Sequence, residues 1–114
     1  MDNARKAAIQ AFKERKQARG IFAVRCRTTG SVWVDSSLDL DAAENRTFFL
    51  ARVGDVQMDK SIQAEYAAHG QEAFNFEVLE KLDQDTIPMA VKDLLRERKR
   101  HWLTQANARP LWPL

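Results

Sequence analysis

The charged residues near the end of this sequence are its first candidates for chemistry. Glu97 and His101 are four residues apart, so on a helix they share one face, where a carboxylate and an imidazole can bind a divalent metal ion. The pair is equally compatible with a solvated helix surface, because charged side chains are mostly exposed. The sequence contains no nucleophile elbow, phosphate-binding glycine loop or spaced metal-ligand cluster.

The formal charge of +2 is unevenly distributed along the chain. Residues 1–27 carry 8 Lys and Arg against 2 Asp and Glu, residues 28–91 carry 4 against 12, and residues 92–114 carry 6 against 2. Two basic segments around an acidic middle favour a polyphosphate partner, although solvated terminal helices would give the same counts. The basic residues selected as candidate phosphate contacts are Lys13, Lys16, Arg96 and Arg100. No aromatic residues are interleaved with them, so these contacts would not read a base sequence.

Composition bounds the class of protein. A chain of 114 residues that is 45% apolar and 30% charged fits one compact domain. No run of eighteen or more apolar residues and no signal peptide are present, which predicts a cytoplasmic protein without a membrane partner. Cys26 is the only cysteine, so neither an internal disulfide nor a cysteine-based zinc cluster can form within one chain.

The elements that must position the candidate residues follow from hydrophobic periodicity and from capping residues. Alternation predicts strands over 21–27, 31–35 and 74–79, with a tight turn at Thr28-Thr29-Gly30. Helical periodicity predicts helices over 3–18, 40–53 and 59–69, and a last helix that begins near Pro88. Residues 108–114 contain two prolines and are expected to pack as an irregular strap.

Two short aromatic tripeptides mark the predicted hairpin. Gly20-Ile21-Phe22 lies in its first strand, and Trp33-Val34-Asp35 lies in its second, followed by Ser36-Ser37. They resemble the Gly-Ile-Tyr and Tyr-Ile-Gly motifs of the GIY-YIG nuclease superfamily. Each tyrosine is replaced by an aromatic residue without a phenolic hydroxyl, and the second glycine is replaced by Asp35.

The resemblance extends over about residues 20–103. Ser61-Ile62-Gln63 with Tyr66, His69-Gly70 and the strand over 74–79 are similar to the middle segment of that family. Short stand-alone bacterial members are the most similar, and Asn45-Arg46 matches a pair in their next helix. The resemblance implies an α/β fold with a three-stranded antiparallel sheet flanked by helices. We therefore expect a basic helix over 1–19 added to a GIY-YIG-like domain over 20–114, together forming a single domain.

The resemblance also implies a set of site residues. In the family an aromatic hydroxyl helps to activate water, an Arg holds the phosphate, and a helical Glu binds Mg²⁺ or Mn²⁺. The matching positions here are Phe22, Trp33, Arg46 and Glu97, with Glu97 as the metal ligand and Arg46 as a further nucleic-acid contact.

Several of these positions depart from the family pattern. Phe22 has no oxygen with which to hold water, and Trp33 offers only an indole donor. The usual Arg position, ten residues after Trp33, is Ala43, and alignment on Trp102 instead of Glu97 puts Lys99 at the Glu position. Asp35 adds negative charge where a phosphate would lie, or binds a cation.

These departures predict a DNA-binding module of the nuclease family with weak or lost endonuclease activity. Two alternatives stay open. The first is an active, metal-dependent endonuclease that uses Glu97 and Arg46 with an unconventional water activator. The second is a protein-interaction domain whose acidic middle and Trp-containing tail bind a partner chain.

Overall fold

The computed structural model describes residues 17–113, so Lys13, Lys16 and almost all of the predicted N-terminal helix lie outside it. The described elements are β1 (Gly20–Cys26), β2 (Val32–Ser37), α2 (Leu40–Val53), α3 (Lys60–His69), a 3-10 turn (Gln71–Ala73), β3 (Phe74–Lys81), α4 (Pro88–Gln105) and β4 (Arg109–Pro110). Each strand and helix predicted within the described range is present. Among these residues no helix is both long enough and apolar enough to cross a membrane.

The sheet has four strands in the order β3-β1-β2-β4. Antiparallel pairing of β1 with β2 and with β3 confirms the predicted three-stranded core and places Phe22 and Trp33 on adjacent strands. The fourth strand was not predicted. β4 pairs in parallel with β2, aligning Trp33 with Arg109 and Val34 with Pro110. A two-residue strand that contains Pro has too little pattern to be found in sequence, and Pro is tolerated at such an edge.

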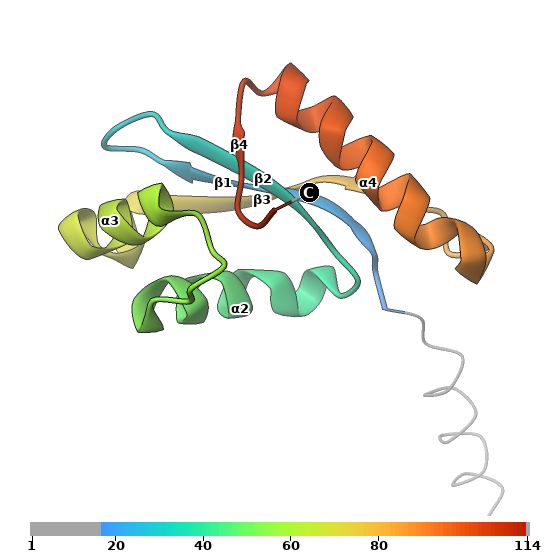
Figure 1. The fold of residues 1–114 in the computed structure, drawn as a ribbon, viewed down its shortest axis with the longest axis horizontal. Coiled ribbons are helices and arrows are strands. Elements are labelled where there is room, and N and C mark those ends of the chain that lie inside the picture. The colour runs from blue at the N-terminus through green and yellow to red at the C-terminus, as the bar shows by residue number, and fades with distance from the viewer. Residues whose placement is uncertain (1–16, 114) are drawn as a thin grey trace, which may run out of the picture.

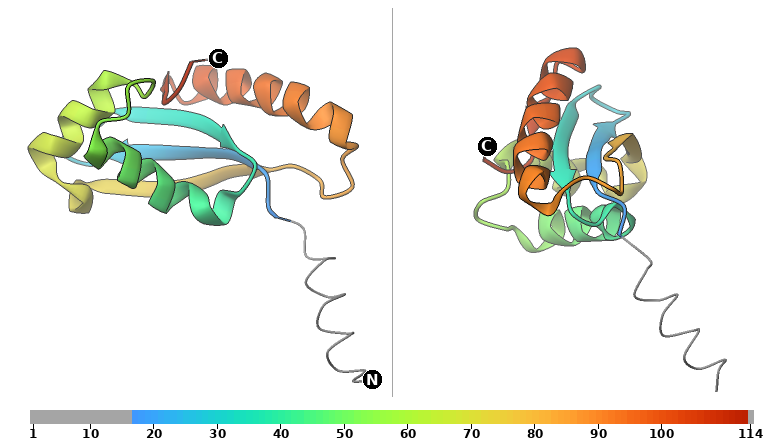
Figure 2. Two further views of the ribbon diagram at one scale, coloured as in Figure 1. Left: turned by 60° about the horizontal axis from the view of Figure 1, so that its bottom comes forward. Right: turned by 90° about the vertical axis from the view of Figure 1, so that its right-hand side faces the viewer.

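Helices cover both faces of the sheet, with α2 and α3 on one face and α4 on the other (Figures 1 and 2). Alternation along β1 divides the core accordingly. Phe22, Val24 and Cys26 pack with α2 and α3, whereas Ile21 and Ala23 pack with α4. A strand that is buried on both faces must be apolar on both, which explains why β1 reads as a nearly continuous hydrophobic run.

α4 is fastened to the sheet by a polar contact as well as by its apolar stripe. Glu80 of β3 forms an ion pair with Arg98 at 2.8 Å and accepts a hydrogen bond from Trp102 Nε1 at 2.9 Å. This contact explains why a charged residue, Arg98, lies near the apolar residues Val91 and Leu95 that α4 packs against the sheet. The hydrogen bonds from Arg98, with a smaller contribution from Trp102, hold the pKa of Glu80 below its ordinary value.

Gly20 begins β1 where the backbone of β3 comes too close for a side chain. A Cβ atom at this position would lie 1.9 Å from the carbonyl oxygen of Glu80. The first motif glycine is therefore required by the packing of one backbone against another, not by a left-handed conformation.

We expect Gly20→Ala to destabilise the protein by about 1–3 kcal/mol or more, because a rigid strand must move to admit the methyl group. Urea unfolding monitored by circular dichroism measures this change. A loss below about 0.5 kcal/mol, the range of ordinary surface substitutions, would show that the two strands can separate at little cost.

The Glu80 contact predicts a pH dependence of stability. A carboxyl group with a lowered pKa in the folded state stabilises the protein above its unfolded pKa of about 4.3, and this contribution is lost as pH falls through the folded pKa. Glu80→Gln should therefore flatten the decrease in unfolding free energy between about pH 5 and pH 3. Glu77→Gln is the control, since the pair between Glu77 and Arg25 is longer, at 3.8 Å, and more exposed. Equal flattening by both variants would contradict the assignment.

Candidate functional site

The two motif aromatics are buried within the core between the sheet and helices α2 and α3. Phe22 is 1% exposed and stacks on Phe76, with ring centroids 5.1 Å apart. Trp33 is fully buried, and its indole Nε1 donates to Ser61 Oγ at 2.9 Å. Ser61 is held there because Asp59 caps α3, accepting the backbone N–H of Ser61 at 3.0 Å. Neither aromatic residue offers a free polar atom to a substrate.

The third residue of the second tripeptide, Asp35, forms a buried ion pair. Lys99 of α4 places Nζ 3.0 Å from Asp35 Oδ1, and both side chains are only 6% exposed. Asp35 also accepts backbone N–H groups from Ser36 at 2.7 Å and from Trp112 at 2.9 Å. The carboxylate therefore has a cationic partner and two further donors, and so it is neutralised within the protein.

The residues that follow β4 complete this cluster. Lys99 Nζ also donates to the carbonyl oxygen of Trp112 at 3.2 Å. The indole Nε1 of Trp112 donates to Asp55 Oδ2 at 3.2 Å, and the Arg46 guanidinium lies 5.7 Å from the indole ring centroid. Asp35, Lys99, Arg46 and Asp55 thus converge on one residue of the tail.

Arg46 is the predicted phosphate contact that the structure brings to this cluster. It is exposed on α2, whereas Ala43, at the usual family position, is 3% exposed and belongs to the core. A guanidinium at position 43 would have to be buried, while Arg46, one helical turn further along, reaches solvent and the Trp112 ring.

Glu97 lies away from this cluster. It is exposed on α4 two residues before the buried Lys99, and two helical steps turn a side chain by about 200° around the axis. His101 is also exposed, and its ring packs edge-on against Trp102. Arg96 and Arg100 are exposed on the same helix. The two alignments possible from sequence therefore place different residues at the site, and the structure brings Lys99, not Glu97, to Asp35.

The donor set does not fit a divalent cation. Residues 17–113 contain no group of three or more His, Cys, Asp or Glu side chains placed to hold one. The only buried carboxylate among them is Asp35, whose oxygens are already engaged by an ammonium and two N–H groups. A metal ion would have to displace Lys99, which would leave a buried ammonium without its partner.

Sequence reasoning missed the partnership of Asp35 with Lys99, although both halves of the signal were visible. The second tripeptide gains an acid where the family has glycine, and alignment on Trp102 gives a base where the family has an acid. Two opposite charge changes that meet in this structure, with Nζ 3.0 Å from Oδ1, are what a compensating ion pair would produce.

Known proteins were compared with the chain in sequence and in structure. No protein-family model matches the sequence, and no curated protein is significantly similar to it. Two solved structures are similar. A point mutant of the catalytic domain of the intron endonuclease I-TevI is 25% identical, with a TM-score of 0.66 over 80% of this chain and 86% of that one. The catalytic domain of the homing endonuclease I-TevI is 20% identical, with a TM-score of 0.62 over 83% of this chain and 99% of that one.

The likeness covers about four fifths of the chain. I-TevI is a GIY-YIG homing endonuclease, and the three antiparallel strands, the two tripeptides on adjacent strands and the flanking helices agree with the expectation from sequence. The chain therefore has a GIY-YIG-like fold, with both tripeptides degenerate.

Proposed function

We propose that this protein is a nucleic-acid-binding member of the nuclease-like family, with DNA as its ligand and with phosphodiester cleavage lost. The observation that carries the proposal is the buried pair of Asp35 and Lys99. It puts an ammonium group at one of the two positions to which the resemblance assigns the metal-binding Glu.

The chemical argument is cumulative. Phe22 can neither activate nor hold a water molecule, and Trp33 already donates its N–H group to Ser61. Removing a single preorganised contact to a transition state typically slows an enzyme by about 10²- to 10³-fold. Loss of both hydroxyls and of the metal ligand would together remove most of the rate enhancement.

The case for nucleic acid rests on likeness and on charge. The two similar structures are catalytic domains of endonucleases. On α4, Lys92, Arg96 and Arg100 are exposed at intervals of four residues and so form one basic stripe, with Lys92 adding to the residues expected from sequence. Glu97 lies beside this stripe and adds a negative charge to the same surface. Each contact would therefore be made by a single cation with a single phosphate.

One prediction of the proposed function concerns cleavage. With Mg²⁺ or Mn²⁺, the purified protein should nick supercoiled plasmid no faster than its Glu97→Ala variant, because the groups that would activate water are missing. Gel electrophoresis of the plasmid measures the rate. Metal-dependent nicking that disappears in Glu97→Ala would sink the proposal and favour the active-enzyme alternative.

A converse experiment restores the missing groups. Phe22→Tyr, Trp33→Tyr, Asp35→Gly and Lys99→Glu are introduced together, since Asp35→Gly alone would leave a buried ammonium without its partner. Circular dichroism must show that this variant is folded before its nicking is compared with that of the unaltered protein.

Another prediction of the proposed function concerns DNA binding. Affinity for duplex DNA should fall steeply with salt, since each phosphate neutralised contributes about −0.9 to the slope of log affinity against log salt. Replacing Arg96 and Arg100 by Ala should flatten that slope by up to roughly 2 units, as measured by fluorescence anisotropy.

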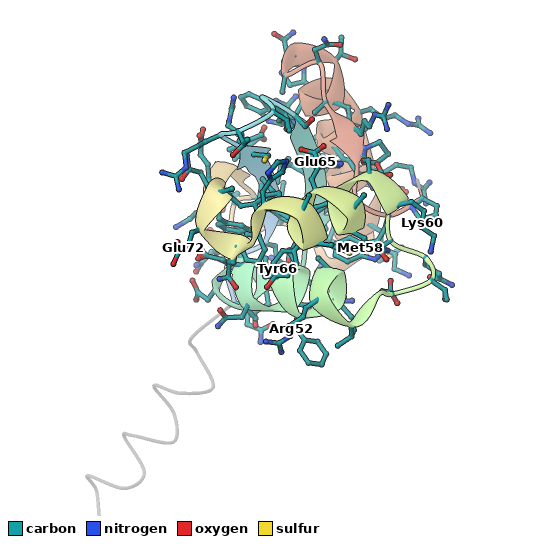
Figure 3. All side chains as sticks on the ribbon, turned by 90° about the vertical axis from the view of Figure 1, so that its left-hand side faces the viewer. Arg52, Met58, Lys60, Glu65, Tyr66 and Glu72 are labelled. Carbon is teal, nitrogen blue, oxygen red and sulfur yellow. The ribbon has the colours of Figure 1, made fainter. Side chains whose placement is uncertain are left out.

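The matched control is the double variant Arg52→Ala and Lys60→Ala. It removes the same charge from the layer of α2 and α3, where Figure 3 shows both residues. An equal effect of both double variants would mean that net charge alone attracts DNA. Binding that ignores salt and both variants would favour the protein-interaction alternative.

A further inference from the structure

The C-terminal strap, defined as residues 108–113, lies against the edge of β2 as a bound peptide would. Figure 1 shows this segment, in red, beside β2 after α4 ends. Its first contact is the parallel pairing of Arg109 and Pro110 with Trp33 and Val34. The strap thus adds a strand to the sheet, which is the backbone mode by which many domains bind extended peptides.

Protein groups outside the strap recognise its backbone beyond this pairing. The Leu111 carbonyl accepts the backbone N–H of Asp59 at 2.7 Å. At the next residue, Asp35 accepts the Trp112 N–H at 2.9 Å and Lys99 donates to the Trp112 carbonyl at 3.2 Å. The buried ion pair therefore binds both polar backbone groups of one strap residue.

The groups that hold the strap also distinguish its side chains. Leu111 is fully buried and belongs to the core cluster beneath the sheet. Trp112 is partly buried, with its indole N–H bonded to Asp55 and its ring beside the exposed guanidinium of Arg46. A buried apolar position followed by an indole site would select Leu and then Trp over other pairs.

The link between α4 and the strap is held separately from these contacts. Asn107 adopts a left-handed conformation, with φ of 50°, and the N–H groups of Asn107 and Ala108 donate to carbonyls near the end of α4. The contacts of residues 109–112 are made with β2, the start of α3, α2, the α2–α3 connection and Lys99. They would therefore be available to an extended peptide that is not joined to α4.

We propose that the groups which hold the strap form a peptide-recognition site for an extended Pro-Leu-Trp segment, and that the strap is its resident ligand in cis. The proposal does not depend on nucleic-acid binding. It also accounts for the position of the ion pair, because the strap supplies hydrogen bonds that a buried Asp and Lys require.

The test uses the full chain with Trp112→Ala and a fluorescently labelled peptide with the sequence of residues 107–114. In the unaltered protein the tethered strap competes at an effective concentration of about millimolar, so the peptide should bind weakly. Trp112→Ala weakens the binding of the strap, and the peptide should bind that variant at least about tenfold more tightly, because the site is free in a larger fraction of the molecules. Fluorescence anisotropy measures the affinity, and thermal unfolding confirms that the variant is folded.

Two substitutions in the Trp112→Ala background locate the site. Arg46→Ala should weaken peptide binding by about twofold to fivefold, the value of an exposed contact between a cation and a ring. Arg52→Ala removes a similar Arg on the same helix, which lies over Phe49 and not over Trp112, and should leave binding unchanged.

If Trp112→Ala does not unfold cooperatively, Trp112→Phe takes its place, because it keeps a ring beside Arg46 and loses only the bond to Asp55. No saturable binding to the folded variant up to about 1 mM peptide would overturn the proposal. Equal binding of a peptide in which Leu and Trp are both replaced by Ser would also overturn it.

Discussion

The buried ion pair between Asp35 and Lys99 is the interaction on which the rest of the site depends. Removing a carboxylate and an ammonium from water costs several kcal/mol per ion, and their attraction offsets that cost only when the remaining hydrogen-bonding positions are also filled. Here they are filled by Ser36 of β2 and by both backbone groups of Trp112. The pair is thus complete only when β2, α4 and the strap have all reached their final positions.

The same ion pair bears on the proposed loss of cleavage. Hydrolysis at a divalent metal requires oxygen ligands and a water molecule that reach the substrate. In this protein the tripeptide positions hold two buried aromatic rings and a neutralised carboxylate, and the tail packs against that carboxylate. Each replacement fits the others physically, since an added acid has a base, and the indole N–H of Trp33 has an acceptor in Ser61.

The strap and the basic stripe of α4 lie close together, because Lys99 sits on the same helix between Arg96 and Arg100. Lys99 and Arg98 of α4 face the sheet, whereas Lys92, Arg96 and Arg100 are exposed, so one helix serves the core and the surface at once. Lys99 organises the tail, and the exposed cations are the ones that the proposed function assigns to phosphates. Adjacent side chains on a helix point about 100° apart, so neighbouring basic residues of α4 face either the sheet or the solvent.

Local pattern was sufficient for most of the fold. Alternation in β1 and β3, the glycine at the end of α2 and the proline at the start of α4 each act over a few residues. The sequence alone therefore predicted α2, α3, α4 and the three antiparallel strands. The missing hydroxyls at Phe22 and Trp33 could also be read directly, because they depend only on residue type. The short strand β4 could not be predicted, because two residues, one of them a proline, carry no periodic signal.

What the tertiary structure decided was which side chains meet. From sequence, Glu97 and Lys99 were both possible at the site, and only the orientation of α4 against the sheet turns Lys99 inward and Glu97 to solvent. The contacts of Trp112 with Asp35, Asp55 and Arg46 join positions separated by dozens of residues. The sequence determined the elements and the chemical groups they carry, because these are local properties. Their convergence depended on packing over long sequence separations, which no local pattern encodes.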